Sequence, residues 1–242
     1  MDQLVGLPYS PWTEKARWAL DHHRVAYRFH EHVPLLGEPL LRLRAPKGKK
    51  PTVPLYLFRG GAIVDSIEIA RHAESIGKGS PLFVTNYVDT IERWNRASEA
   101  LLGVARGLVI RNLLADKDAQ VEAIPRFMPF RSMLTPVARS ATRFIGSKYA
   151  ASESPELDVE RVVIPLLDEW KAELGGRDTL FDTFSYADIT MAVALHFVTP
   201  VGGDYIRLGP ATRRTWTHSG LSKKYADLLA WRDALYAKYR KA

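Results

Sequence analysis

The sequence predicts a mixed α/β domain over residues 1–78, followed by an all-helical domain over residues 85–242. Two observations lead to this fold class. Short apolar segments with the composition of strands fade after residue 78, and longer stretches with helical spacing of apolar residues replace them. Between the two parts, Gly77-Lys78-Gly79-Ser80-Pro81 combines small residues, a charge and a proline, which is typical of a linker. A chain of 242 residues is long enough for two such domains.

The predicted first domain opens with a strand, a helix and a second strand. The short apolar segment 3–7 is the first strand, and residues 27–32 alternate as the second. The helix between them spans 11–23, because proline suits the first helical position and Ser10 stands before it as a candidate N-cap. A short helix around 39–43 follows, and then an exposed loop.

The stretch 53–76 predicts two strands, a tight turn and a helix. Residues 53–58 and 62–64 are the strands, and the paired glycine between them supplies the positive φ that a hairpin requires. Asp65 and Ser66 then precede apolar residues at helical spacing. A helix N-terminus carries unpaired N–H groups and a positive dipole end, so it can receive a carboxylate. Both residues also favour capping, so the sequence leaves a cap and a ligand site open.

Beyond the linker the sequence predicts five helices, with a capping motif before one of them. The helices are expected at about 86–115, 119–147, 154–174, 185–200 and 222–238. Ser185 and Asp188 form a Ser-x-x-Asp pattern before an apolar helix, which is a capping-box arrangement with Asp in place of the usual Glu or Gln. This motif is expected to be structural rather than catalytic.

Composition excludes several classes of function. The formal charge of +7 is spread over short basic runs without a long stripe or a recognisable module, so we expect no nucleic-acid partner. No continuous apolar run of about 18 residues occurs, so no membrane span is expected. The absence of cysteine excludes disulfides, thiolate catalysis and cysteine metal sites, and no other metal-binding motif is present. With no secretory signal visible, a cytoplasmic protein is expected.

Three motifs together carry a resemblance to a known family. Ser10-Pro11 opens one helix, Val53-Pro54 precedes the hairpin, and Asp65-Ser66 opens the next helix. Their order, with a helical domain after them, resembles cytosolic glutathione S-transferases of the serine type, bacterial-like, over the whole chain. The resemblance implies a thioredoxin-like glutathione-binding domain and an all-helical C-terminal domain, with glutathione as cosubstrate.

The resemblance also implies a role for each site residue. Ser10 would donate a hydrogen bond to the glutathione thiolate, whose formation a helix N-terminus favours. Val53, before a cis Pro54, would pair its backbone with the cysteinyl part of glutathione, and Thr52 beside it is a further candidate. Asp65 and Ser66 would hold the γ-glutamyl end. Lys50 is the candidate partner of the glycine carboxylate, although the spacing from Lys49 and Lys50 to Val53 is longer than in the family.

Several alternatives stay open at this point. Tyr9 is a second hydroxyl at the end of the first strand, although Ser10 fits the family position better. The expected function is a detoxification-type glutathione transferase acting on a small, electrophilic, largely apolar substrate, as a homodimer. The alternatives are a glutathione-binding or partner-binding protein with little transferase activity and, from the charge alone, a nucleic-acid binder.

Overall fold

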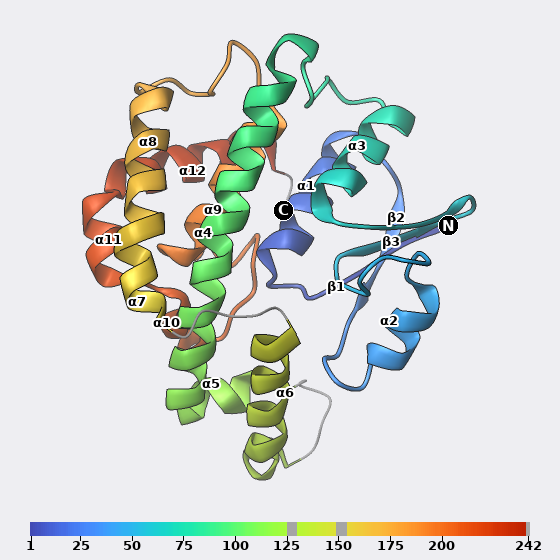
Figure 1. Cartoon of the computed structure of the whole chain (residues 1–242), viewed down its shortest axis with the longest axis vertical. Coiled ribbons are helices and arrows are strands. Elements are labelled where there is room, and N and C mark those ends of the chain that lie inside the picture. The colour runs from blue at the N-terminus through green and yellow to red at the C-terminus, as the bar shows by residue number, and fades with distance from the viewer. Residues whose placement is uncertain (125–129, 149–153, 241–242) are drawn as a thin grey trace. The chain divides into compact units, whose positions relative to one another are not determined.

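A computed structural model describes residues 1–124, 130–148 and 154–240 of the chain (Figure 1). Its sheet contains four strands: β1 (Asp2–Gly6), β2 (Tyr27–Glu31), β3 (Leu55–Phe58) and β4 (Gly61–Val64). Their order is β2-β1-β3-β4, with β1 and β2 parallel and the other two pairs antiparallel. The mixed sheet with its helices, followed by a helical region, confirms the predicted fold class.

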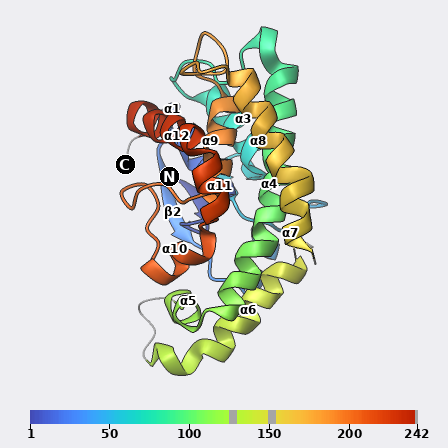
Figure 2. The same cartoon turned by 90° about the vertical axis from the view of Figure 1, so that its left-hand side faces the viewer.

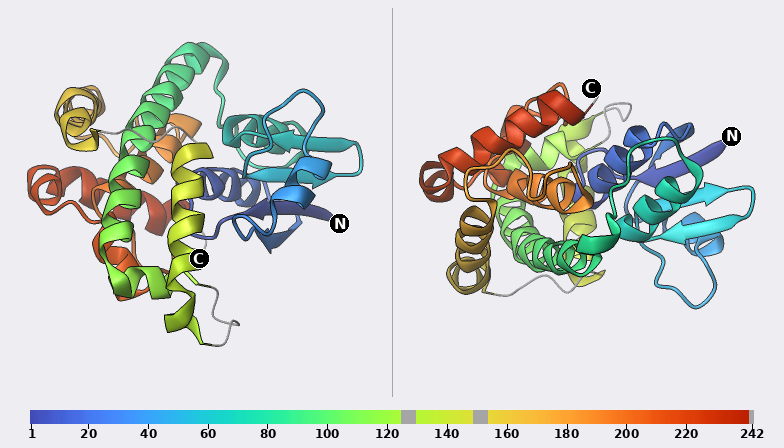
Figure 3. Two further views of the ribbon diagram at one scale, coloured as in Figure 1. Left: turned by 60° about the horizontal axis from the view of Figure 1, so that its bottom comes forward. Right: turned by 90° about the horizontal axis from the view of Figure 1, so that it is seen from above.

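Two helices cover one face of the sheet. The helix α1 spans Pro11–His22 and α3 spans Ser66–Ile76, both close to the predicted bounds. They lie side by side in Figures 1 and 3. Their apolar faces meet the central strands in a fully buried cluster, which consists of Leu4, Ala16, Leu20, Tyr56, Ile69 and Ala73. Because this cluster ties α1 and α3 to β1 and β3, it fixes the positions at which both helices begin.

The short helix α2 (Glu38–Arg44) lies away from α1 and α3 (Figure 1). The helices after α3 are α4 (Val88–Ala115), α5 (Lys117–Glu122), α6 (Thr135–Lys148), α7 (Pro155–Asp158), α8 (Ile164–Leu174), α9 (Tyr186–Ala194), α10 (Pro210–Trp216), α11 (Ser219–Lys224) and α12 (Ala226–Tyr239). Short 3₁₀ turns occur at Thr85–Tyr87, Arg131–Leu134 and Leu195–Phe197, and a π-helical turn at Val159–Val163 joins α7 to α8.

The predicted single helix over 119–147 is wrong. The structure ends α5 at Glu122 and begins α6 at Thr135, while residues 125–129 lie outside the described residues. The predicted helix over 222–238 is likewise divided, because the chain leaves the helical conformation at Tyr225 between α11 and α12. The helix α10 was not predicted at all.

Contacts divide the chain into two compact units. The first consists of Met1–Arg96, Arg177–Val193 and Trp231–Ala242, and the second of Ala97–Gly176 and Ala194–Ala230. The sheet lies in the first unit together with most of α9 and most of α12, and the second unit is helical. The predicted division into domains 1–78 and 85–242 stays a prediction.

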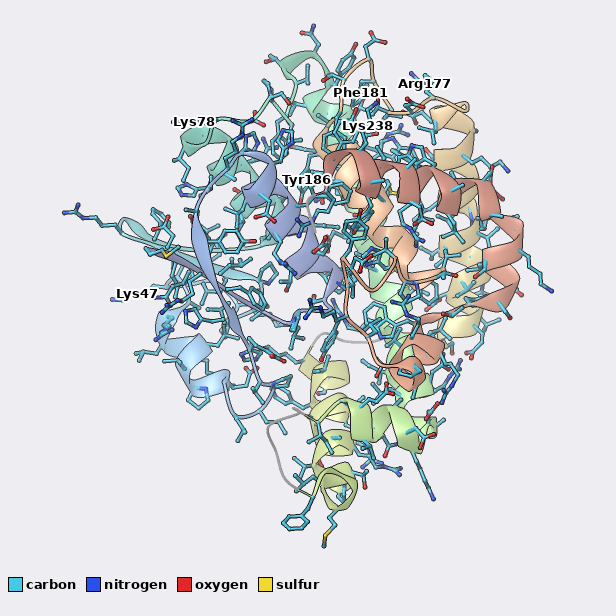
Figure 4. The ribbon with its side chains drawn as sticks, turned by 180° about the vertical axis from the view of Figure 1, so that it is seen from behind. Lys47, Lys78, Arg177, Phe181, Tyr186 and Lys238 are labelled. Carbon is cyan, nitrogen blue, oxygen red and sulfur yellow. The ribbon has the colours of Figure 1, made fainter. Side chains whose placement is uncertain are left out.

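The capping motif before α9 lies in the first unit and is fully buried. The Asp188 carboxylate accepts hydrogen bonds from the backbone N–H of Leu180 and Ser185, each at 2.8 Å, and from the Ser185 hydroxyl. The neighbouring Tyr186 (labelled in Figure 4) donates its backbone N–H to the carbonyl oxygen of Leu82. The motif is therefore structural, as predicted.

Among the described helices, none combines the length and the apolar character that crossing a bilayer requires.

Candidate active site

The strand register brings the three predicted motifs to one end of the sheet. Leu55 pairs with Val5 of β1 on one side and with Val64 of β4 on the other. The segment that ends β1 leads to Ser10, the segment before Leu55 contains Val53-Pro54, and Val64 is followed directly by Asp65. Residues separated by more than fifty positions therefore meet at one edge, where α1 and α3 both begin.

Ser10 stands at the N-terminus of α1 without capping it through its side chain. Its backbone is extended, with φ −74° and ψ 128°, and its carbonyl oxygen accepts the first helical hydrogen bond from the N–H of Glu14 at 2.9 Å. No side-chain capping hydrogen bond is formed by this residue within the described structure, although it is buried. The Ser10 hydroxyl is therefore held at a helix N-terminus, where an anion is stabilised.

Tyr9, the alternative hydroxyl, is half-buried beside Ser10. Burial, together with the nearby Glu31 carboxylate, raises the pKa of Tyr9 to about 12. The phenol is therefore neutral throughout the physiological range.

The Val53–Pro54 peptide bond is cis, as predicted. Pro54 is buried, whereas Thr52 and Val53 are partly exposed. The three residues precede β3 in an irregular segment, so the Val53 backbone is not part of the strand pairing described for β3.

Asp65 has a strained backbone and caps α3. Its φ of 83° is uncommon for a residue other than glycine, and such strain costs about 1–3 kcal/mol and concentrates at functional sites. The side chain is exposed, and its Oδ1 accepts a hydrogen bond of 3.2 Å from the N–H of Ile67. Of the two roles that the sequence left open for Asp65, the structure shows the cap.

Ser66 supplies a buried hydroxyl at the same helix N-terminus. The residue is 1% exposed, and its Oγ has no hydrogen-bond partner among the described residues. A buried hydroxyl without a partner costs free energy, so a site of this kind is completed favourably by a bound polar ligand.

Lys50 lies on an exposed loop and is not positioned by regular structure. The loop turns at Gly48, whose φ is +79°, and the N–H of Lys49 donates to the carbonyl oxygen of Pro46 at 3.1 Å. Lys47, on the same loop, extends outward in Figure 4. The structure places Lys50 two residues before Thr52.

Sequence reasoning missed the buried charges behind the start of α1. The Nε of Arg240 donates to Oε1 of Glu14 at 2.8 Å, and its Nη1 donates to Oδ2 of Asp21 at 2.7 Å. Glu14 is 1% and Arg240 is 6% exposed. The two residues lie 226 positions apart, so no local pattern signals the pair.

Two family models match the chain. The model for the glutathione S-transferase N-terminal domain matches residues 4–81, and the model for the glutathione S-transferase C-terminal domain matches residues 149–234. The first match contains Ser10, Val53-Pro54 and Asp65-Ser66. No curated protein sequence matches the chain.

Solved structures share the fold at low sequence identity. A glutathione S-transferase from Methylobacterium radiotolerans, in complex with glutathione sulfonate, has a TM-score of 0.61 at 18% identity, with 98% of this chain and 90% of that chain covered. One from Methylobacillus flagellatus with glutathione bound has a TM-score of 0.59 at 16% identity, covering 98% and 95%. A glutathione transferase from Phanerochaete chrysosporium has a TM-score of 0.62 at 18% identity, covering 100% and 98%.

Proposed function

Because the chain belongs to the glutathione S-transferase family, we propose that it binds glutathione and activates the thiol for attack on a small, electrophilic, largely apolar substrate. Two proteins of the same fold were crystallised with glutathione or glutathione sulfonate, which supports glutathione as the cosubstrate.

The observation that carries this proposal is that the three motifs lie at one end of the sheet. Ser10 begins α1, Asp65 and Ser66 begin α3, and the cis Val53–Pro54 bond lies before the strand between them. A helix N-terminus stabilises an anionic group, and two helix N-termini lie at this end of the sheet. Glutathione carries two carboxylates, an ammonium and a thiol, so one molecule can place its thiol at Ser10 and its γ-glutamyl end at Asp65 and Ser66.

In the proposed reaction, glutathione loses its thiol proton to solvent and the Ser10 hydroxyl donates a hydrogen bond to the sulfur. The positive end of α1 adds to this stabilisation, because a thiolate is favoured near a helix N-terminus. The sulfur lone pair then forms a bond to the electrophilic carbon of the substrate, and the leaving group departs with the electrons of the broken bond. Asp65 pairs with the glutathione ammonium, and the Ser66 hydroxyl donates a hydrogen bond to the γ-glutamyl carboxylate. Lys50 and Thr52 are proposed to contact the rest of the glutathione molecule.

The first experiment measures binding without requiring catalysis. We expect titration calorimetry to show glutathione binding to the wild type and weaker binding to Ser66→Ala, since the variant lacks the buried hydroxyl. Ser75→Ala is the matched control, because Ser75 lies exposed on the same helix and its hydroxyl bonds to the carbonyl oxygen of His72. Absence of glutathione binding by the folded wild type would reject the proposal.

The second experiment measures chemistry with a generic aromatic halide as the electrophile. Conjugation that depends on Ser10 supports a transferase. Glutathione binding without conjugation of any member of an electrophile panel favours the alternative, a glutathione-binding or partner-binding protein on this fold.

We further propose a cytoplasmic homodimer. Light scattering checks the assembly, because a mass near that of one 27.3 kDa chain contradicts it.

A further inference from the structure

The end of α12 packs on α1, the helix that carries Ser10. Figure 2 shows this end of α12 beside α1, and the contact lies within the first compact unit. Trp18 of α1 lies against Tyr236 of α12 with ring centroids 4.4 Å apart. One turn further along the chain, Arg240 reaches Glu14 and Asp21. The last described residue of the chain therefore contacts the first turn of α1, whose N-cap is Ser10.

The Arg240 guanidinium forms a two-pronged contact with the Glu14 carboxylate. Its Nε donates to Oε1 at 2.8 Å, and its Nη2 approaches Oε2 at 3.4 Å. The third nitrogen, Nη1, bonds to Asp21. A guanidinium fork can donate two parallel hydrogen bonds to one carboxylate, which a lysine ammonium cannot do, so arginine suits this position better than lysine.

Glu14 lies close to the proposed site of the thiolate. It is the residue whose N–H bonds to the Ser10 carbonyl oxygen, and residues four apart on a helix have Cβ atoms about 5–6 Å apart. A buried carboxylate at this distance opposes the formation of a second negative charge at the helix N-terminus. The family resemblance accounts for Ser10 but not for an acid placed immediately behind it.

Other groups around Glu14 do not replace Arg240. Arg17 of α1 approaches the carboxylate at 3.9 Å and is 28% exposed, so solvent screens it. Tyr236 of α12 is neutral, because burial and the Glu14 charge raise its pKa well above the ordinary value. Asp21 adds a second negative charge on the other side of the guanidinium. Arg240 is thus a buried cation whose guanidinium is hydrogen-bonded directly to Glu14.

We infer that Arg240 is a positioning residue for the reaction: it neutralises the buried Glu14 carboxylate and fixes the first turn of α1, so that Ser10 and the helix N-terminus can stabilise the glutathione thiolate. This inference rests on the proposed function, because it concerns the same thiolate.

The test is the pH dependence of thiolate formation in the complex with glutathione, followed by ultraviolet absorbance. In Arg240→Met the Glu14 charge is uncompensated. At about 8 Å and an effective dielectric constant of about 20, one such charge raises the pKa of the bound thiol by about one and a half units. We expect kcat/KM to fall about thirtyfold at a pH below that pKa, and the difference to shrink at higher pH.

Two further variants separate charge from packing. Glu14→Gln combined with Arg240→Met removes both charges, and we expect it to restore the thiol pKa to the wild-type value. Arg240→Lys keeps the charge but loses the fork, so we expect a less stable protein with a nearly unchanged thiol pKa. Lys238→Met is the matched control: Lys238 (Figure 4) lies on α12 two residues before Arg240, is 59% exposed and pairs with Asp178 at 3.8 Å.

The outcomes distinguish this inference from the proposed function. A wild type that lowers the thiol pKa of glutathione, with Arg240→Met equal to it, overturns the inference and leaves the proposed function intact. A shift in Arg240→Met that the double variant does not reverse also overturns it. If Arg240→Met does not fold, the double variant and Arg240→Lys decide: wild-type thiol pKa values in both support the inference, and a raised value in either contradicts it. A wild type that binds glutathione without lowering its thiol pKa rejects the proposed function and the inference with it.

Discussion

The hydroxyl of Ser185 donates a hydrogen bond of 2.8 Å to the carboxylate of Asp188, three residues further along the chain and just inside α9. Both side chains are 0% exposed. The same carboxylate holds the N–H groups of Leu180 and Ser185, so it satisfies backbone donors before the helix as well as at its start. One buried acid therefore ties a loop to a helix.

We expect Ser185→Ala to lower the free energy of unfolding by about 1–2 kcal/mol, because a buried hydrogen bond to a charged group is lost while the backbone contacts of Asp188 remain. Urea unfolding measures the change, and the exposed serine variant Ser75→Ala is the control. A loss equal to that of the control would show that the hydroxyl contributes nothing.

Asp188 should make stability depend on pH. Burial raises its pKa to about 6 from an ordinary 3.8. The folded state therefore binds this proton more tightly than the unfolded state, and the free energy of unfolding falls as the pH rises from about 4 to about 6, with no further change from this group above that range. A shift of about two units corresponds to about 3 kcal/mol.

The measurement compares urea unfolding of the wild type and of Asp188→Asn across this pH range. The variant has no titrating group at this position. The free energy of unfolding of the wild type should therefore fall relative to that of the variant as the pH rises from about 4 to about 6. A difference that is constant with pH would show that Asp188 does not titrate in the range.

We expect Ser10→Ala to lower kcat roughly ten- to a hundredfold, since a hydrogen bond to a charged sulfur contributes about 1.5–3 kcal/mol. The same substitution should change stability by less than about 0.5 kcal/mol, because the Ser10 side chain does not cap α1. Tyr9→Phe, which removes the neighbouring hydroxyl, is the control. Loss of turnover in Tyr9→Phe with normal turnover in Ser10→Ala would assign the activating hydroxyl to Tyr9.

We expect Asp65→Gly to separate ligand binding from folding. Glycine accepts the φ of 83° without strain and replaces a capping residue at a cost of a few tenths of a kcal/mol, so stability should be kept or raised. The glutathione ammonium loses its charge partner, and we expect KM for glutathione to rise at least about tenfold with a smaller change in kcat.

Asp89→Ala, at an exposed acid in the first turn of α4, controls for the loss of one negative charge. Unchanged glutathione affinity in Asp65→Gly would assign Asp65 to capping alone.

The first ninety residues were predictable because their signals are local. Pro11 after Ser10, Gly60-Gly61 between apolar runs and Asp65-Ser66 before an apolar face each specify a turn or a helix start within a few residues. The structure contains each of these elements, with boundaries shifted by one or two positions. The same signals place the motifs of the candidate site, because each motif begins or precedes a regular element, whereas the roles of its residues stay predictions.

The later helices depend on contacts that the local sequence does not contain. The start of α10 is held by Glu122, whose carboxylate accepts from the N–H groups of Ala211 and Thr212, about ninety residues further on. At Tyr225 the phenol donates to Ile164 and Asp168, and the chain leaves its helix there. Pro165 cannot donate a backbone hydrogen bond, and a π-helical turn precedes it. Of these three cases, only Pro165 gives a signal in the local sequence.

The composition of the first compact unit has a consequence for biosynthesis. Trp18 lies on α1, yet its ring contacts Phe184 at 5.9 Å and Tyr236 at 4.4 Å between centroids, and both partners belong to the same unit. During translation these partners are made long after the strands, and Arg240 is made later still. A nascent chain that has reached only residue 78 therefore has a complete sheet sequence, but it exposes an indole and lacks the cation for Glu14. The first compact unit therefore cannot complete its packing until the segment that carries Tyr236 and Arg240 has been made.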